Sequence, residues 1–194
     1  SFRSILSPDV ASKLRELLPG YLQYVDWHLA YSPQLHGTSL KTFYRRQAGA
    51  NFIVIRDATG GIFGGYAAEA WRPRTGAYGN GESFVFMATS AGSEVPISED
   101  NDTEALSAAF QNMHVEVYRA TLQRGEPIQW SDAKMLGLGR AVMVQEDLLR
   151  GSSGRCEAFG CTSSLSLAGD DFVIRDFECW HVGIPEDFVA THAD

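Results

Sequence analysis

The chain has 194 residues, of which 44% are hydrophobic and 21% charged, and its formal net charge at pH 7 is −8. This composition predicts a globular protein, and the length fits one domain. The acidic balance argues against a nucleic-acid binder, which needs a basic stripe for phosphates, and against a basic helix on a membrane surface. No apolar run approaches the roughly 20 residues that span a bilayer, so no transmembrane segment is expected.

The cysteine content and the start of the chain bear on its location. Three cysteines are an odd number and too few for a secreted disulfide framework, which favours a reducing compartment and a cytoplasmic location. No signal peptide is visible in the first residues. Because the sequence starts without Met, we expect it to be part of a longer chain.

The first part of the sequence predicts two helices and a strand. Ser7 can cap a helix with Pro8 in its first turn, and the apolar face has helical spacing: Val10, Leu14, Leu17 and Leu18. A strand is expected over residues 27–32. A short helix is expected over residues 40–46, with Ser39 in the turn that caps it.

Residues 51–71 are expected to form the centre of the sheet, as two apolar strands joined by a tight turn. The first strand, residues 52–55, is a continuous apolar run rather than an alternation, which predicts cover on both faces. The turn at residues 57–61 contains two glycines that can adopt positive φ. The return strand is expected over residues 62–66.

The second half of the sequence predicts mainly strands. They are expected at residues 81–87, 114–119, 127–130, 135–144 and 172–182. Residues 91–113 contain an acidic stretch and a short helix, and residues 151–154 read as a loop. In the closing strand, the alternation places Phe172 and Ile174 on one side and Phe177 on the other.

Many strands with few helices predict a mainly β (α+β) fold, a two-sheet antiparallel β-sandwich flanked by short α-helices. The predicted organisation is one domain over residues 1–194. Its core extends from about residue 5 to 182, with an acidic insertion at residues 91–113 and a tail at residues 183–194.

Three polar residues form a candidate hydrolytic set: His36, Ser39 and Glu82 each fall at a turn or strand edge. The structural alternative is that Ser39 caps a helix, Glu82 accepts backbone N–H bonds and His36 is solvated. Nothing in the sequence fixes the distances between the three, and the G-x-S-x-G turn of α/β-hydrolases is absent. We therefore favour the structural alternative and expect no enzyme.

The cysteines offer two further candidates. Cys156, Cys161, Cys179 and His181 contain zinc-ligand atoms, but paired C-x₂-C spacing is absent, and buried free thiols are the simpler interpretation. We expect no metal and no cofactor. Arg155 beside Cys156 is a faint indication of thiol redox chemistry, which needs an exposed thiolate near a cation.

A set of motifs in a fixed order resembles the TLDc domain, the module of oxidation-resistance proteins, nuclear receptor coactivator 7 and certain TBC-domain proteins. The matching segments include residues 27–46, 53–71, 78–86, 136–139 and 172–180. Together with shorter pieces they cover nearly the whole core. Two departures stand out: the insertion at residues 91–113, and Gly137-Leu138-Gly139 in place of a longer glycine run.

The resemblance implies a two-sheet sandwich and a role in protection against oxidative stress without an established catalytic mechanism. It also implies binding to the soluble head of the vacuolar-type proton-pumping ATPase and regulation of its assembly, at the endolysosomal or vacuolar membrane surface; a mitochondrial isoform is left open. The family positions for that role map to Gly64, Gly81, Glu82, Gly137, Gly139 and Glu178. As an alternative, the glycines are bends that hold the sheets together.

Two other functions stay open at this point. One is a thiol-based or hydrolytic enzyme that acts on oxidants through Cys156 or the set of Ser39, Glu82 and His36. The other is a membrane-traffic docking module in a larger protein of the TBC-TLDc type. On either binding account, the acidic insertion favours a basic partner surface, because opposite potentials speed docking.

Overall fold

The computed structural model describes residues 2–90, 113–121 and 127–183. In these residues the helices are α1 (Pro8–Glu16), α2 (Pro33–His36) and α3 (Leu40–Arg45), with 3-10 turns at Gly20–Leu22 and Glu157–Phe159. The strands are β1 (Trp27–Tyr31), β2 (Asn51–Asp57), β3 (Ile62–Ala67), β4 (Phe84–Ser90), β5 (Met113–Arg119), β6 (Gln129–Ser131), β7 (Met135–Leu138), β8 (Val142–Gln145), β9 (Arg150–Ser152) and β10 (Asp171–Val182). None of the described helices is long and apolar enough to cross a membrane.

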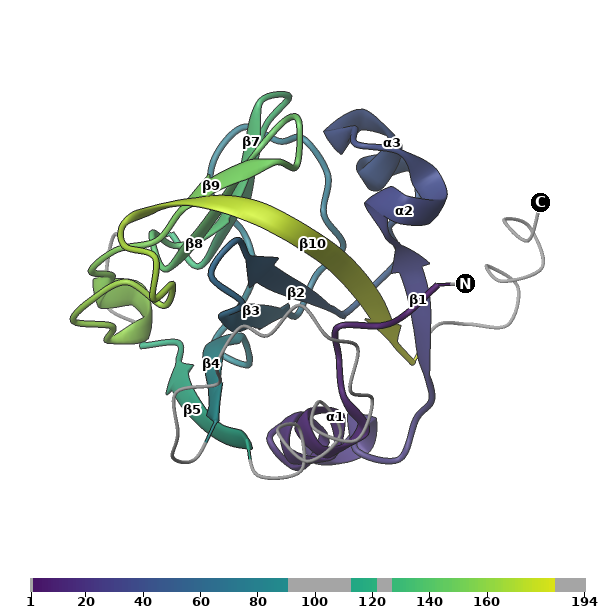
Figure 1. Ribbon diagram of the computed structural model, residues 1–194. Helices are drawn as coiled ribbons and strands as arrows, with labels where there is room; N and C mark the ends of the chain where they lie inside the picture. Colours follow the sequence, from purple (N-terminus) through teal and green to yellow (C-terminus); the bar gives the residue numbers. More distant parts are fainter. Residues whose placement is uncertain (1, 91–112, 122–126, 184–194) are drawn as a thin grey trace.

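The long strand β10 connects all the others (Figure 1). The hydrogen-bonded order is β5-β4-β3-β2-β10-β9-β8-β7-β6, with β1 also paired to β10, and every pairing is antiparallel. The beginning of β10 pairs with β9, residues 174–181 pair with β2, and residues 179–182 also pair with β1. The predicted mainly β fold with peripheral helices is confirmed, and the two layers of strands are continuous through β10.

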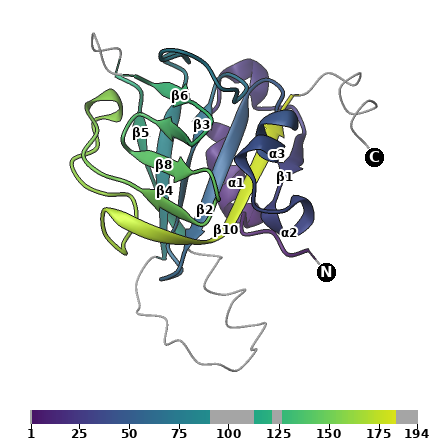
Figure 2. The ribbon, with the colours of Figure 1, turned by 90° about the horizontal axis from the view of Figure 1, so that it is seen from above.

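The central hairpin separates two apolar cores. Phe52, Ile53, Val54 and Ile55 are fully buried. Phe52 and Val54 face α1, with Leu14, in what we call the helix-side core. Ile53 and Ile55 belong to the inner core, which also contains residues of β7 and β8. The predicted cover on both faces of this strand is therefore confirmed, and Figure 2 shows α1 on the outer side of this layer, away from β8.

The two predicted helix caps are present. The Ser7 Oγ accepts a hydrogen bond of 3.3 Å from the Val10 N–H at the start of α1. The Ser39 Oγ likewise accepts one of 3.3 Å from the Thr42 N–H at the start of α3. These bonds satisfy backbone donors that have no partner within the helix. Helix α2 was not predicted, because four residues are too short to show a helical period.

Two predictions in the second half were wrong. Residues 135–144 form a hairpin of β7 and β8 rather than one strand, because Gly139 has φ +52° and turns the chain. Residues 150–152, partly predicted as a loop, form β9. A Cβ on Gly151 would lie 2.5 Å from the Met143 carbonyl oxygen, so glycine here permits a close backbone approach that resembles a loop in sequence.

The alternation predicted for β10 holds only for its first residues. The pairing with β2 shifts register between Ile174 and Asp176, which is a β-bulge. The extra residue reverses the direction of the following side chains, so Phe177 joins Phe172 and Ile174 in the inner core instead of facing away from them. The predicted insertion, apart from Met113, and the tail beyond residue 183 lie outside the described residues.

Candidate functional site

Three of the glycines that the resemblance singles out occupy places where no side chain fits. A Cβ on Gly64 would lie 2.0 Å from the Ile53 carbonyl oxygen, and one on Gly137 would lie 2.5 Å from the indole of Trp130. Gly139 adopts φ +52°, which L side chains rarely adopt. These positions have structural reasons to be glycine, independent of any partner.

Glu178 on β10 is also enclosed, with 2% of its surface exposed. Its carboxylate accepts a hydrogen bond of 2.7 Å from the Ile5 N–H and two of 2.8 Å, from the Ser4 hydroxyl and the Trp180 Nε1. Donors to a carboxylate make stronger hydrogen bonds than neutral pairs. Glu178 therefore fastens the segment that precedes α1 to the centre of the sheet.

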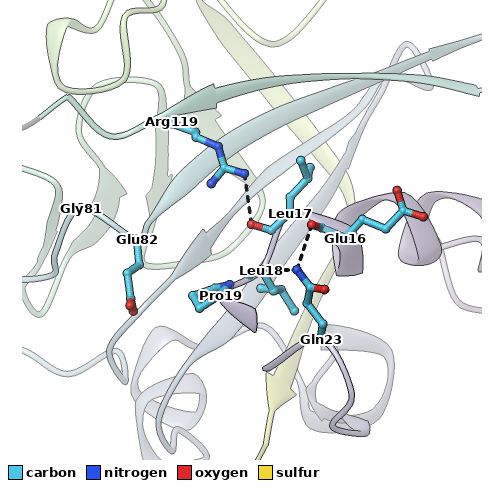
Figure 3. A pocket seen from close by; sticks show the side chains of 8 residues that line it. All are labelled: Glu16, Leu17, Leu18, Pro19, Gln23, Gly81, Glu82 and Arg119. Carbon is cyan, nitrogen blue, oxygen red and sulfur yellow. Dashed lines mark hydrogen bonds between the residues drawn. The ribbon is translucent and has the colours of Figure 1, made fainter. Parts of the chain in front are cut away.

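Gly81 and Glu82 are the exposed members of the set, and both line a groove of about 510 Å³ (Figure 3). We call it the α1 groove. It lies between the C-terminal end of α1, the turn that precedes β4, and the end of β5. Its lining residues are Glu16, Leu17, Leu18, Pro19, Gln23, Gly81, Glu82 and Arg119.

Side-chain to backbone hydrogen bonds fix the wall of the α1 groove on the side of the helix. The Arg119 Nη2 donates to the Leu17 carbonyl oxygen at 3.2 Å (Figure 3). The Gln23 Nε2 donates to the carbonyl oxygens of Glu16 at 3.1 Å and Leu18 at 2.9 Å. The last carbonyls of a helix have no partner within it, and these bonds supply one.

The rim of the α1 groove carries charges and aromatic side chains. Glu16, Glu82 and Arg119 form no ion pair with another described residue. Tyr21 and Tyr24 follow α1 and are 69% and 90% exposed. The Tyr21 hydroxyl donates to Glu82 Oε2 at 3.4 Å, and partial desolvation together with this carboxylate raises its pKa. Exposed tyrosines beside a groove are typical of protein interfaces.

The candidate hydrolytic set is not brought together. Ser39 caps α3, and the His36 Nδ1 accepts the Ser32 N–H at 3.1 Å. Burial and the nearby Arg46 lower the pKa of His36. Glu82 lies in the α1 groove, and α1 lies at the opposite end of the molecule from α3 (Figure 1). Among the described residues, no hydrogen bond or ion pair joins Glu82 to either of the other two.

The residues considered as candidate zinc ligands fall into separate places. Cys156 and Cys161 face each other in an isolated β-bridge, whereas Cys179 and His181 are on β10. The Cys179 thiol donates to the Gln47 Oε1 at 3.6 Å, and burial raises its pKa to about 12. Within the described part of the chain, no group of three or more His, Cys, Asp or Glu residues could hold a metal ion.

Buried His181 makes stability dependent on pH. Its Nε2 accepts the Ala48 N–H at 3.1 Å, and burial, with smaller effects of His28 and Arg46, lowers its pKa to about 4. Between pH of about 6.5 and about 4 the unfolded chain binds a proton that the folded chain does not. We expect this group to lower the free energy of unfolding by about 3 kcal/mol over that range.

Urea unfolding at several pH values, for the protein and for His181→Gln, measures this effect. The variant should lose less stability than the protein as the pH falls, because glutamine keeps an acceptor for Ala48 but binds no proton. Identical pH profiles for the two would contradict the assignment.

The sequence analysis missed most of the α1 groove. Arg119 is far along the sequence from Glu16 and Gln23, and no local motif marks the three residues. The one available signal was the pair of tyrosines in the short segment between the first helix and the first strand, since aromatic residues in a loop often make contacts with a partner.

Comparisons with known proteins agree with this architecture. A family model described as the TLDc domain matches residues 1–183. Oxidation resistance protein 1 of Kluyveromyces lactis is 31% identical over 195 residues, which cover 92% of this chain and 76% of the relative. Oxidation resistance protein 1 of Rattus norvegicus is 32% identical over 182 residues, covering 91% of this chain and 19% of the relative.

Nuclear receptor coactivator 7 of Homo sapiens is 30% identical over 171 residues, which cover 87% of this chain and 16% of the relative. The chain thus spans about three quarters of the yeast relative and less than a fifth of the two mammalian ones. The family model covers every described residue, from the segment before α1 to the end of β10. The chain therefore belongs to the TLDc domain family.

Proposed function

We propose that this chain is a non-enzymatic protein-interaction domain that acts in protection against oxidative stress. The names of its relatives, oxidation resistance protein 1, support the cellular role. In this proposal it binds the soluble head of the vacuolar-type proton-pumping ATPase and regulates its assembly. It does so in the cytoplasm, at the endolysosomal or vacuolar membrane surface where its partner resides.

One observation carries the proposal: Gly81 and Glu82, the exposed family positions, meet in the α1 groove. Tyr21, which is exposed and donates a hydrogen bond to Glu82, supplies rigid aromatic area, which dominates binding energy in many interfaces. The groove offers two carboxylates and one guanidinium, and the whole chain has a net charge of −8. A partner surface with positive charge would complement this excess of negative charge. The separation of Glu82 from Ser39 and His36 supports a role without catalysis.

A titration of the purified chain against the purified soluble head of the ATPase tests the proposal. Glu82→Arg reverses an exposed charge in the α1 groove, and Tyr21→Ala removes the exposed aromatic ring that contacts Glu82. Each should weaken binding by about tenfold or more, equivalent to about 1.4 kcal/mol. Because both side chains are exposed, the melting temperatures of the two variants should match that of the protein.

Glu146→Arg is the matched control. Glu146 is exposed, and its carbonyl accepts the Leu40 N–H of α3, at the far end of the molecule from the α1 groove. This variant changes the net charge as Glu82→Arg does and should bind like the protein. Equal weakening by both charge reversals would contradict a specific groove. The absence of binding at micromolar concentrations would remove the ATPase as the partner.

A further inference from the structure

Two cysteines face each other across a short antiparallel bridge. The Cys156 N–H donates to the Cys161 carbonyl oxygen, and the Cys161 N–H to that of Cys156, both at 2.9 Å. Residues paired in this way have Cα atoms about 5.5 Å apart and side chains on the same face. Disulfides form between Cα atoms that are roughly 4.4–6.8 Å apart. The backbone already holds the two thiols at a spacing that a disulfide accepts.

Both thiols are free and buried in the inner core, with exposed fractions of 1% for Cys156 and 3% for Cys161. Cβ atoms of a directly opposed pair are about 4.5–5.5 Å apart, whereas those of a disulfide are about 3.8 Å apart. A bond must therefore draw the two side chains together. A disulfide that stores strain is more easily reduced, which suits a reversible bond rather than a permanent one.

We propose that Cys156 and Cys161 form a reversible intramolecular disulfide in the presence of a hydroperoxide, and that this bond changes the turn at Gly139 and Arg140. Formation of this disulfide is separate from the proposed partner binding and does not depend on it.

The Cys156 sulfur contacts the turn at Gly139 and Arg140, so a new bond to this sulfur affects the turn. The Arg140 N–H donates to the Cys156 Sγ at 3.3 Å, and a Cβ on Gly139 would lie 2.5 Å from the same sulfur. A bond to Cys161 draws this sulfur toward the bridge and weakens its hydrogen bond to Arg140. The Trp130 Nε1 donates to the Gly139 carbonyl at 2.8 Å, so the change reaches β6.

The turn is also part of a surface hollow. Gly139, Arg140 and Trp130 line a hollow of about 530 Å³ together with residues of the loop that follows β3, among them Arg74. A shift of the turn changes the shape of this hollow. The oxidation state of the two buried cysteines would then determine the shape of this part of the protein surface.

The reaction balances with hydrogen peroxide as the simplest oxidant. The Cys156 sulfur attacks one peroxide oxygen, the O–O bond breaks, and a sulfenic acid and one water form. The Cys161 sulfur then attacks the sulfenic sulfur, the S–O bond breaks, and a disulfide and a second water form. The two thiols lose two electrons and two protons in total, and the peroxide takes up both. Burial and the neighbouring Cys156 raise the pKa of Cys161 to about 12, so little of its thiolate is present for the second step and the reaction is slow.

The test treats the chain with hydrogen peroxide, unfolds and alkylates it, and digests it with trypsin. Cleavage after Arg155 and Arg175 places both cysteines in the single peptide 156–175 and leaves Cys179 in another. We expect peptide 156–175 to lose two hydrogen atoms and to escape alkylation, and dithiothreitol to reverse both changes. Cys179 should stay available for alkylation. A peptide that gains only oxygen, or that stays fully alkylated after prolonged treatment, would overturn the proposal.

Two variants and a second measurement test the link to the turn. Cys161→Ser should prevent the loss of two hydrogens, whereas Cys179→Ser should leave it unchanged. In the oxidised protein the Arg140 amide should exchange hydrogen about tenfold faster than in the reduced protein, because its acceptor has moved. Cys161→Ser should show no such difference after the same treatment. A disulfide that forms without a change at Arg140 would overturn the link between the bond and the turn.

Discussion

Replacement of Glu178 by alanine is expected to lower the free energy of unfolding by about 3 kcal/mol or more. The change removes the acceptor for the Ile5 N–H, the Ser4 hydroxyl and the Trp180 Nε1. A buried donor left without a partner costs about 1–3 kcal/mol, and two of these three are at least partly enclosed by the protein. Urea unfolding measures the loss.

Glu178→Gln is the matched variant, since the side chain keeps its size and one acceptor oxygen. It should lose clearly less stability than the alanine variant. Hydrogen exchange in α1 gives a second readout, because Ser4 and Ile5 hold the segment that leads into this helix. An alanine variant as stable as the protein, with unchanged exchange in α1, would show that the three hydrogen bonds contribute little.

This result also affects how binding data should be interpreted. The end of α1 forms one wall of the α1 groove. A Glu178 variant that binds a partner weakly would do so because α1 has lost its anchor, without any contact between Glu178 and the partner. Glu82 and Tyr21 are better positions for a test of contact, since both are exposed and they contact each other.

Gly64→Ala is expected to destabilise the protein by about 3 kcal/mol or more. The added Cβ would lie 2.0 Å from the carbonyl oxygen of Ile53, which is backbone and cannot change rotamer. Overpacking in a core commonly costs about 1–3 kcal/mol, and this overlap separates β2 from β3 at the centre of the sheet. Thermal and urea unfolding of the variant provide the measurement.

Gly154→Ala is the control for this substitution. A Cβ there meets no atom within 4 Å, and its backbone lies outside the positive-φ region. Its effect should stay within about 0.5 kcal/mol, as for most surface substitutions. Similar stability in both alanine variants would mean that β2 and β3 separate at little cost, contrary to the packing described above.

The fold was predictable where one local signal determines the structure. The apolar run at residues 52–55 has no polar residue to place in water, so it predicted a strand covered on both sides. Ser7 and Ser39 have the short polar side chain that an N-cap needs. The bulge in β10 left no such signal, because an extra residue such as Arg175 looks like one more step of a regular alternation.

The candidate site was less predictable, because residues distant in the sequence build it. The family resemblance alone singled out Gly81 and assigned Glu82 to partner binding, whereas the residue pattern had placed Glu82 in the candidate hydrolytic set. Arg119 became part of the same surface only through the pairing of β4 with β5, which brings the end of β5 beside the start of β4. Neither the pairing nor the position of α1 against it follows from a local pattern.

The position of β10 at the end of the described chain has a consequence for synthesis in the cell. A ribosome makes residues 171–182 after the other strands that the structure describes, yet this strand pairs with β1, β2 and β9. Until β10 emerges, β2 lacks one of its two neighbouring strands. The Glu178 carboxylate is also not yet present to accept the hydrogen bonds of Ser4 and Ile5. The two layers of the nascent domain therefore stay unjoined until β10 emerges, and β10, the last of the described strands, completes both.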